Sequence, residues 1–308
     1  MEKTRVLILG ASGMLGHKLF QHLSRNSGYS VYAAVRSRSD LADFLPEDIP
    51  GRVWEKVDAH VMDSVVGLLA RVRPDVVINA IGIVKQSSAA SDPLTVIPIN
   101  ALFPHRLAEV CLAVGAKMIQ ISTDCVFDGK AGNYRERDLP NPPDLYGRSK
   151  LLGEVVYPHC LTLRTSIIGH ELRGHLGLLD WFLGREERVR GFTEAVYSGL
   201  TTPELARVIG DYVIPQLDRL QGLYHLSAAP ISKYDLLRLL AAQYRKNIVI
   251  EPDGSVVTDK SLNSGRFCSL MGYLPPSWEE LVVRLHEDFC RSHYHLNIGS
   301  GGQENEGI

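Results

Sequence analysis

The sequence has few cysteines, and none of them stands at a C-x-x-C spacing. Its 308 residues include five cysteines, an odd number at unpaired spacings: Cys111, Cys125, Cys160, Cys268 and Cys290. This pattern argues against a disulfide framework and against a zinc knuckle. The histidines show no ligand spacing tied to carboxylates either. We therefore expect a cytoplasmic, reducing environment and no bound metal.

The sequence also lacks an excess of charge of one sign and a long hydrophobic run. Its 33 basic and 35 acidic residues are mixed along the chain and leave a net charge of -2, which argues against a nucleic-acid partner. The apolar run at residues 5–9 is too short for an export signal or a membrane span, so we expect no membrane partner. A hydrophobic content of 45% is ordinary for a soluble enzyme.

What the first half does contain is a regular alternation of apolar runs and helical patterns. Four helices are expected, at 14–24, 61–72, 98–114 and 146–156. The apolar runs predict strands at 6–9, 30–35, 53–57, 75–78, 117–122 and 161–163. Sequential β-α-β units of this length predict an α/β fold with a doubly wound parallel sheet of the Rossmann type.

Beyond residue 164 the alternation loosens, which indicates a smaller C-terminal substrate domain. Expected helices at 178–188, 203–217, 233–245 and 278–293 mix there with short strands such as 223–226. The expected NADP-binding Rossmann domain is 1–164 plus about 191–222, and the substrate domain is 165–190 and 223–298. Residues 299–308, GSGGQENEGI, are too polar and glycine-rich to bury surface and are expected to form a flexible tail.

A glycine-rich segment, Gly10-Ala-Ser-Gly13-Met-Leu-Gly16, directly follows the first expected strand and opens a helix. Glycines at such places permit a tight turn, close approach of the backbone to a pyrophosphate, and close packing of helix on strand. Free N–H groups at the helix start then hold the anion. The expected cofactor contacts in this segment are Gly10, Ser12, Gly13, Met14, Leu15 and Gly16.

The end of the second strand, Arg36-Ser37-Arg38, indicates which dinucleotide binds. An acidic residue there would accept a hydrogen bond from the ribose of NAD, whereas two arginines suit the 2′-phosphate of NADP. The alternative is a solvated basic loop. We therefore favour NADP over NAD as the cofactor.

Further cofactor contacts are expected where the third and fourth strands end. Asp58 could accept from the adenine amino group or could cap the following helix, and Asn79 could equally be a loop residue that satisfies backbone groups. Small residues follow Asn79, where a cofactor would lie. The remaining expected cofactor-binding residues are Asp58, Ala59, Ala80, Ile81, Gly82, Asn100, Tyr146 and Lys150.

Tyr146-Gly-Arg-Ser-Lys150 is the strongest feature of the sequence. Positions four apart lie on one helix face, so the phenol and the ammonium point into one cleft. Reduction of a carbonyl needs a proton for the developing alkoxide, and a neighbouring ammonium should lower the phenol pKa. Ser122-Thr123 ends the fifth strand and could supply a hydroxyl that fixes the substrate oxygen. A Tyr-x-x-x-Lys spacing by itself would indicate only a pair of surface residues. Because it follows the glycine turn and Ser122-Thr123 in the chain, it predicts an active site.

With these motifs the chain resembles the extended short-chain dehydrogenase/reductases, in particular the dTDP-4-dehydrorhamnose reductase branch. The matching segments are GASGMLG (10–16), NAIG (79–82), STDCVFDG (122–129), YGRSKLLGE (146–154), LRTSIIG (163–169) and SLNSGRF (261–267). The resemblance implies NADPH-dependent reduction of the 4-keto group of a nucleoside-diphosphate 4-keto-6-deoxyhexose, in deoxysugar biosynthesis. By the same resemblance Thr123, Tyr146 and Lys150 are the catalytic trio, and the substrate contacts include Val84, Ser122, Thr123 and Arg266.

Two positions depart from that branch and leave the sugar open. Ile167 stands where the rhamnose reductases have a tryptophan, and Cys125 stands where they usually have tyrosine. GDP-fucose synthases, which epimerise before they reduce, resemble this chain at Cys125 and have a histidine near the position of His170. Cys125 and His170 could therefore form an acid–base pair for 3,5-epimerisation, because a 4-keto group acidifies the adjacent C–H bonds. Their ordinary alternatives are a small buried cysteine and a loop histidine.

A function of another class also fits the resemblance, because the same branch includes the regulatory subunit of methionine adenosyltransferase. An NADP-binding regulator would be free to lose the catalytic trio, and its presence here favours an enzyme. A 4,6-dehydratase usually has an acidic pair after the strand-ending Ser/Thr, and this chain has only Asp124 there. The nucleotide base, the sugar stereochemistry and the choice between a monomer and a homodimer stay open.

Overall fold

The computed structural model describes residues 2–41, 52–174 and 176–292; the expected tail at 299–308 lies outside them. Its centre is a seven-stranded sheet in the order β11-β6-β5-β4-β1-β2-β3, in which every pair is parallel. The strands are β1 (Thr4–Leu9), β2 (Tyr29–Ala34), β3 (Val53–Trp54), β4 (Val76–Asn79), β5 (Lys117–Thr123), β6 (Cys160–Thr165) and β11 (Gly222–His225). The order reverses between β1 and β4, and this topological switch point confirms the expected doubly wound fold.

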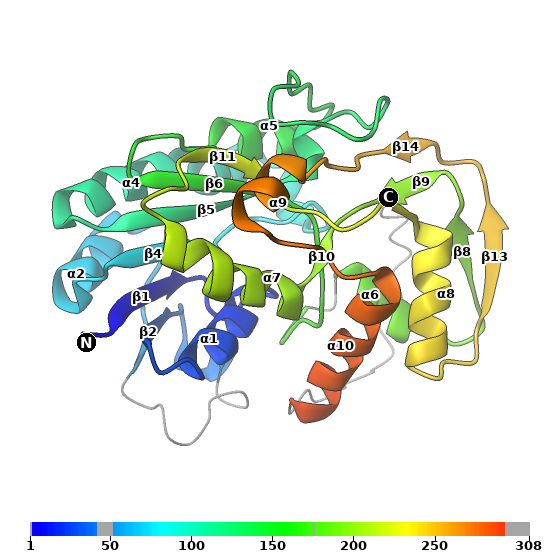
Figure 1. Ribbon diagram of the computed structural model, residues 1–308, viewed down its shortest axis with the longest axis horizontal. Coiled ribbons are helices and arrows are strands. Elements are labelled where there is room, and N and C mark those ends of the chain that lie inside the picture. The colour runs from blue at the N-terminus through cyan, green and yellow to red at the C-terminus, as the bar shows by residue number, and fades with distance from the viewer. Residues whose placement is uncertain (1, 42–51, 175, 293–308) are drawn as a thin grey trace.

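Helices cover both faces of this sheet (Figure 1). Val6 and Ile8 of β1 pack with α1 (Gly16–Ser24) and α7 (Thr202–Val208) in one core. Leu7 and Leu9 pack on the other face with α2 (Met62–Val72) and α4 (Phe103–Val114). Because side chains alternate along a strand, one continuous apolar run supplies both cores.

The helix before β5 is interrupted by a π turn. It runs as α3 (Pro93–Val96), the π turn η5 (Ile97–Leu102) and α4. By length and hydropathy the span Pro93–Val114 could cross a membrane, but half of its apolar window is buried inside the fold, as in a core helix of a soluble protein. The π turn places Asn100 in the interior, beside the loop that follows β4, and such turns are frequent at functional sites.

Three small sheets form beside the carboxyl end of the main sheet. They pair β7 (Ile167–Ile168) with β10 (Leu200–Thr201), β13 (Val249–Asp253) with β8 (Arg188–Phe192), and β12 (Ile231–Ser232) and β14 (Thr258–Asp259) with β9 (Ala195–Tyr197). Helices α6 (Leu178–Leu183), α8 (Lys233–Gln243) and α10 (Trp278–Arg291) lie on the same side of the molecule, while α9 (Gly265–Met271) packs near β11 (Figure 1). Short 3-10 and π turns complete the chain at η1 (Arg38–Asp40), η4 (Ser88–Ser91), η6 (Asp124–Val126), η7 (Ile209–Val213) and η8 (Ile214–Gln216).

The structure corrects several expected element bounds. The helix expected at 178–188 ends at Leu183, because β8 begins at Arg188 and pairs with β13. The strand expected at 53–57 is only two residues long. The helix expected at 146–156 ends at Leu152, before Gly153, where a Cβ atom would overlap the carbonyl oxygen of Asn100.

The segment expected at about 191–222 contains both small-sheet strands and elements that pack on the main sheet. β11 pairs with β6 in the main sheet, so His225 belongs to that sheet and not to the substrate side. Conversely, the residues of β8 and β9 pair only with small-sheet strands among the described residues. Helix α7 packs with β1 in the core of the main sheet, and β11 extends that sheet at its edge.

Candidate active site

The glycine turn after β1 has the geometry that a pyrophosphate needs. Gly10 has a φ of 78°, and a Cβ atom there would lie 3.0 Å from the backbone of Ala80. At Gly16 a Cβ atom would overlap the carbonyl oxygen of Gly10, whereas Gly13 is exposed. Helix α1 begins without a side-chain cap and without an acidic residue in its first turn. Its N-terminus is thus suited to an anion.

The basic end of β2 is followed by one acidic residue, Asp40, before the described segment ends at residue 41. Arg36 and Arg38 are exposed, and the nearest acid, Asp40, accepts a hydrogen bond from the Ser37 backbone N–H. Asp40 also pairs with Arg173 at 2.9 Å, from the segment that follows β7. Since Asp40 is engaged, the described part of this corner suits a 2′-phosphate better than a ribose hydroxyl.

Asp58 and Asn79 both satisfy backbone groups. The Asp58 carboxylate accepts from His60 N at 2.9 Å in the turn before α2. The Asn79 Oδ1 accepts from Ile81 N at 3.1 Å, and its amide donates to Gln120. The contacts of Asn79 correspond to its ordinary alternative, whereas Asp58 does not cap α2, whose N-cap residue Val61 has no side-chain cap. The Asn79 contacts also shape the loop of Ala80, Ile81 and Gly82, in which Gly82 is exposed.

Asn100 ties that loop to the helix α5 (Leu145–Leu152). Its Oδ1 accepts from Ile83 N at 2.9 Å, and its amide donates to Ile83 O and to Ser149 Oγ. A Cβ atom on Gly82 would lie 3.7 Å from Lys150 Nζ. The loop after β4, the π turn and α5 therefore meet where the cofactor is expected.

Thr123, Tyr146 and Lys150 come together at the carboxyl end of β5. The Tyr146 hydroxyl lies beside the Thr123 side chain, whose own hydroxyl donates to Asp124 Oδ1 at 3.1 Å. The Lys150 ammonium donates to the Ile121 carbonyl at 2.8 Å. Asp144 caps α5 by accepting from Gly147 N at 2.8 Å. The i, i+4 spacing places both side chains of α5 on the strand side of the helix, as expected from helical geometry.

Burial dominates the ionisation of this trio. Burial raises the pKa of the Tyr146 phenol, with the neighbouring Cys125 adding to the shift and Thr123 opposing it. Burial also lowers the pKa of Lys150 to about 8, against the opposing charge of Glu154. We expected Lys150 to lower the phenol pKa, but in the free protein this pKa is raised, mainly by desolvation. Tyr146 thus holds its proton until a negative oxygen develops beside it.

Ser122 is turned away from the trio. Its hydroxyl donates to Glu154 Oε1 at 2.6 Å, and Glu154 pairs with Arg164 at 2.7 Å. Adjacent side chains on a strand point to opposite faces, so Thr123 and Ser122 cannot both face one substrate. The expected substrate contact of Ser122 is therefore not supported by its position.

His170 and Cys125 do not form the expected pair. His170 is 2% exposed, and its two ring nitrogens are hydrogen-bonded to Asp180 and to the Tyr244 hydroxyl, each at 2.8 Å. Its ring also packs against Phe289 of α10, with 4.6 Å between centroids. Cys125 lies instead beside Tyr146, where burial raises the pKa of its thiol to about 12. The loop histidine is a buried structural group because α6, α8 and α10 close over it.

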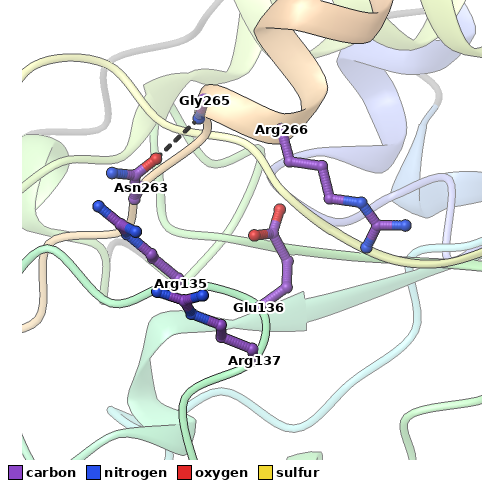
Figure 2. A pocket seen from close by; sticks show the side chains of 6 residues that line it. All are labelled: Arg135, Glu136, Arg137, Asn263, Gly265 and Arg266. Atoms are coloured by element: carbon purple, nitrogen blue, oxygen red, sulfur yellow. Dashed lines mark hydrogen bonds between the residues drawn. The ribbon is translucent and has the colours of Figure 1, made fainter.

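Arg266 lies at the outer edge of the main sheet. Its guanidinium donates to Leu223 O at 3.0 Å and stands 4.2 Å from the Tyr224 ring centroid. β11 and β6 separate it from β5, and two interstrand spacings are about 10 Å. Figure 2 shows the pocket of about 490 Å³ that it lines there, with Arg135, Glu136, Arg137, Asn263 and Gly265. The structure therefore does not bring Arg266 to Thr123 and Tyr146, whereas Val84, 45% exposed, follows the cofactor loop directly.

Three lysines near the trio were missed from the sequence. Lys85, Lys233 and Lys260 all exert their charge on Cys125 or on the buried Asp124 next to it. They come from the loop after β4, from the start of α8 and from the residue after β14. The one available signal was position: Lys85 stands three residues after NAIG, and Lys260 directly precedes SLNSGRF.

Comparison with known proteins adds the following findings. The family model described as the RmlD substrate binding domain matches residues 4–257. The dTDP-4-dehydrorhamnose reductase of Aggregatibacter actinomycetemcomitans is 28% identical over 242 residues, which are 75% of this chain and 76% of that protein. Methionine adenosyltransferase 2 subunit beta of Bos taurus is 35% identical over 153 residues, 49% of this chain. The match spans only 41% of the length of that subunit.

Two solved structures share the fold. The dTDP-4-dehydrorhamnose reductase of Bacillus anthracis, in complex with NADP, superposes with a TM-score of 0.74 at 24% identity. This comparison covers 94% of this chain and 99% of that one. The UDP-glucose 4-epimerase of Thermus thermophilus, in complex with NAD, gives a TM-score of 0.76 at 19% identity over 93% and 99% of the two chains. At these identities the likeness concerns the fold alone.

Proposed function

We propose that this protein uses NADPH to reduce the 4-keto group of a nucleoside-diphosphate 4-keto-6-deoxyhexose. The chain belongs to the RmlD substrate binding domain family, and this membership is the starting point of the proposal. The observation that carries the proposal is the contact between Tyr146 and Thr123 at the end of β5, with Lys150 one helical turn away. Relatives named dTDP-4-dehydrorhamnose reductase support the same reaction class.

In this proposal the reacting carbonyl lies against Thr123 and Tyr146. When bound, the dinucleotide supplies the hydride. Thr123 orients the carbonyl oxygen, and Tyr146 donates its proton as negative charge develops there. The Lys150 ammonium stabilises the phenolate that remains. Since burial keeps the phenol protonated beforehand, the proton is present when it is needed.

The expected cofactor, NADP, fits the residues at its site. Gly10, Gly13 and Gly16 leave space for a pyrophosphate at the start of α1. Arg36 and Arg38 would hold the 2′-phosphate, and Lys150 and Asn100 lie beside the loop of Gly82 where the nicotinamide ribose would bind. We propose that the main sheet and its helices form the cofactor unit and that the three small sheets form the substrate unit.

A second candidate is an NADP-binding regulatory subunit, which the relatives named methionine adenosyltransferase 2 subunit beta favour. These relatives share about half of this chain with it. A regulator has no need of a proton donor, so the intact trio speaks for the enzyme. Tight NADP binding without turnover of any keto sugar would establish the regulator.

Prior 3,5-epimerisation by Cys125 and His170 receives no support from their positions. Both ring nitrogens of His170 are engaged, and a thiol with a pKa of about 12 is protonated near neutrality and is a poor base. We therefore propose reduction without epimerisation by this pair. Incubation in deuterium oxide tests this: deuterium incorporation at C3 or C5, lost on Cys125→Ser, would contradict it.

The deciding experiment is a panel of 4-keto-6-deoxy sugars carried on dTDP, GDP and UDP, each made in situ. NADPH oxidation is followed by absorbance, and the sugar product is identified by NMR. We expect one nucleotide series to be reduced at C4. If no member is reduced, although NADP binds tightly, the proposed reaction is excluded.

A further inference from the structure

Lys85, Lys233 and Lys260 reach one place from three separate segments. The charges of Lys85 and Lys260 act on Lys233 and on Cys125, and Lys260 also acts on Asp124. All three side chains are half-buried. Because like charges repel, such a cluster is unfavourable in a partly desolvated site unless an anion joins it.

The small sheet β12-β9-β14 places two of these lysines on either side of its central strand. Ser232 of β12 and Asp259 of β14 both pair with Val196 of the central strand β9, from opposite sides. Lys233 and Lys260 are the residues that directly follow them. Because β12 runs antiparallel and β14 parallel to β9, Lys233 lies toward Ala195 and Lys260 toward Tyr197. About 12 Å therefore separates the two backbones, and two long lysine side chains can span this distance to reach an anion held between them.

The stem of Lys260 is held in place by a tight turn. Asp259 N donates to Gly129 O at 2.7 Å, and a Cβ atom on Gly129 would lie 3.0 Å from Lys260 Cγ. Gly129 has a φ of 81°, a conformation that favours glycine. The turn after β5 thereby fixes Lys260 beside the residues that follow Thr123.

The acidic groups nearby do not balance three positive charges. Lys85 pairs with Asp144 at 3.2 Å, but neither Lys233 nor Lys260 makes an ion pair with another residue in the described part of the chain. Asp124 is buried, and burial raises the pKa of its carboxyl, so it is a weak counter-ion. The site therefore carries an excess of positive charge next to Tyr146.

We propose that Lys85, Lys233 and Lys260 bind the diphosphate of the sugar nucleotide, which places the attached sugar against Thr123 and Tyr146. This inference rests on the proposed function. It assigns the diphosphate to lysines of the small sheet and of the β4 loop. The arginine pocket outside β11 is a different place, because Arg135, Arg137 and Arg266 are solvent-exposed and two strands away from β5.

The test uses isothermal titration calorimetry: the protein is first saturated with NADP⁺ and is then titrated separately with dTDP, UDP and GDP. Saturation keeps these probes out of the cofactor site. Each of Lys233→Gln and Lys260→Gln is expected to weaken binding of the tightest diphosphate about tenfold, and the double variant about a hundredfold, because each removes one charge-assisted bond. Lys260→Arg is expected to retain most of the affinity.

The matched control is Lys117→Gln, which removes a lysine at the opposite end of β5, paired there with Asp218. It is expected to bind diphosphates like the wild type, and NADP⁺ affinity and melting temperature should be unchanged in all variants. A double variant within threefold of the wild type overturns the inference, and so does a wild type that binds no diphosphate.

Turnover measured in parallel separates this inference from the proposed function. If the wild type reduces a keto sugar and the lysine variants keep its KM, the reductase stands and the lysine site is wrong. If the lysines govern diphosphate binding but no sugar is reduced, the lysine site stands and the reductase is wrong.

Discussion

The main sheet and the small sheets approach the site from opposite sides and hold their polar groups differently. On the main-sheet side Thr123 ends a seven-residue strand that is paired along both edges, and Tyr146 lies on a capped helix. On the other side Lys233 and Lys260 follow strands of two residues each. The proposed proton donor thus lies on an extensively paired frame, whereas the proposed diphosphate lysines follow short strands that tertiary pairing holds together.

The largest expected effect comes from a substitution on the main-sheet side alone. Tyr146→Phe removes the proton donor and should lower turnover about 10²- to 10⁴-fold. NADP⁺ and diphosphate affinities should stay within about twofold, because the ring still fills its place. Steady-state kinetics and calorimetry measure both, with Tyr157→Phe as a surface control. Turnover near that of the wild type would exclude the proposed mechanism.

The next effect concerns the buried hydrogen bonds of His170 with Asp180 and Tyr244. His170→Ala leaves the buried Asp180 and Tyr244 without their partner and should reduce the free energy of unfolding by about 2 to 4 kcal/mol. The folded fraction should keep its specific activity, since His170 does not contact the trio. Denaturant titration checks this against His60→Ala, an exposed histidine. Full stability with lost turnover would instead make His170 catalytic.

A smaller effect tests whether residues of the main-sheet side alone determine the preference for NADPH over NADH. The double variant Arg36→Gln/Arg38→Gln should lower the preference for NADPH over NADH about 10- to 100-fold, through loss of bonds to the 2′-phosphate. Affinity for a nucleoside diphosphate should not change. Arg106→Gln, on the exposed side of α4, is the control. If the preference for NADPH over NADH is unchanged in the double variant, the two arginines do not bind the 2′-phosphate and belong to a solvated basic loop.

The smallest effect is a pH dependence of stability from Lys150. Its pKa is about 8 in the folded protein and about 10.4 when unfolded. Between these values the unfolded state binds more protons, so the contribution of this group to stability rises with pH. From about pH 8 to 9.5 the wild type should gain about 1 to 2 kcal/mol relative to Lys150→Met. Parallel pH curves for the two proteins would show that Lys150 is not desolvated.

The sequence was most informative where the function depends on local spacing. The glycine turn of Gly10, Gly13 and Gly16 and the Tyr146–Lys150 spacing lie on the elements that their patterns predicted. Each motif is read within one turn or one helix, where the backbone fixes the geometry. Ser122 shows the limit even there, because adjacent strand residues face opposite sides.

Sequence reasoning failed where distant segments decide the environment. Strands of two residues, such as β12 and β14, have no periodicity to detect, so Lys233 and Lys260 gave no signal of convergence. His170 resembled a site residue by position, but Phe289, more than a hundred residues later, covers its ring. Arg266, which the resemblance puts near the nucleotide end of the substrate, lies beside β11, a strand that was not expected in the main sheet.

The buried amide of Asn100 has a consequence for how the site responds to heat. One side chain holds both the Ile83 backbone and Ser149 of α5, so the dinucleotide loop and the helix of the proton donor move as one body. Gradual warming should therefore leave the spacing between nicotinamide loop and phenol constant until the whole core melts.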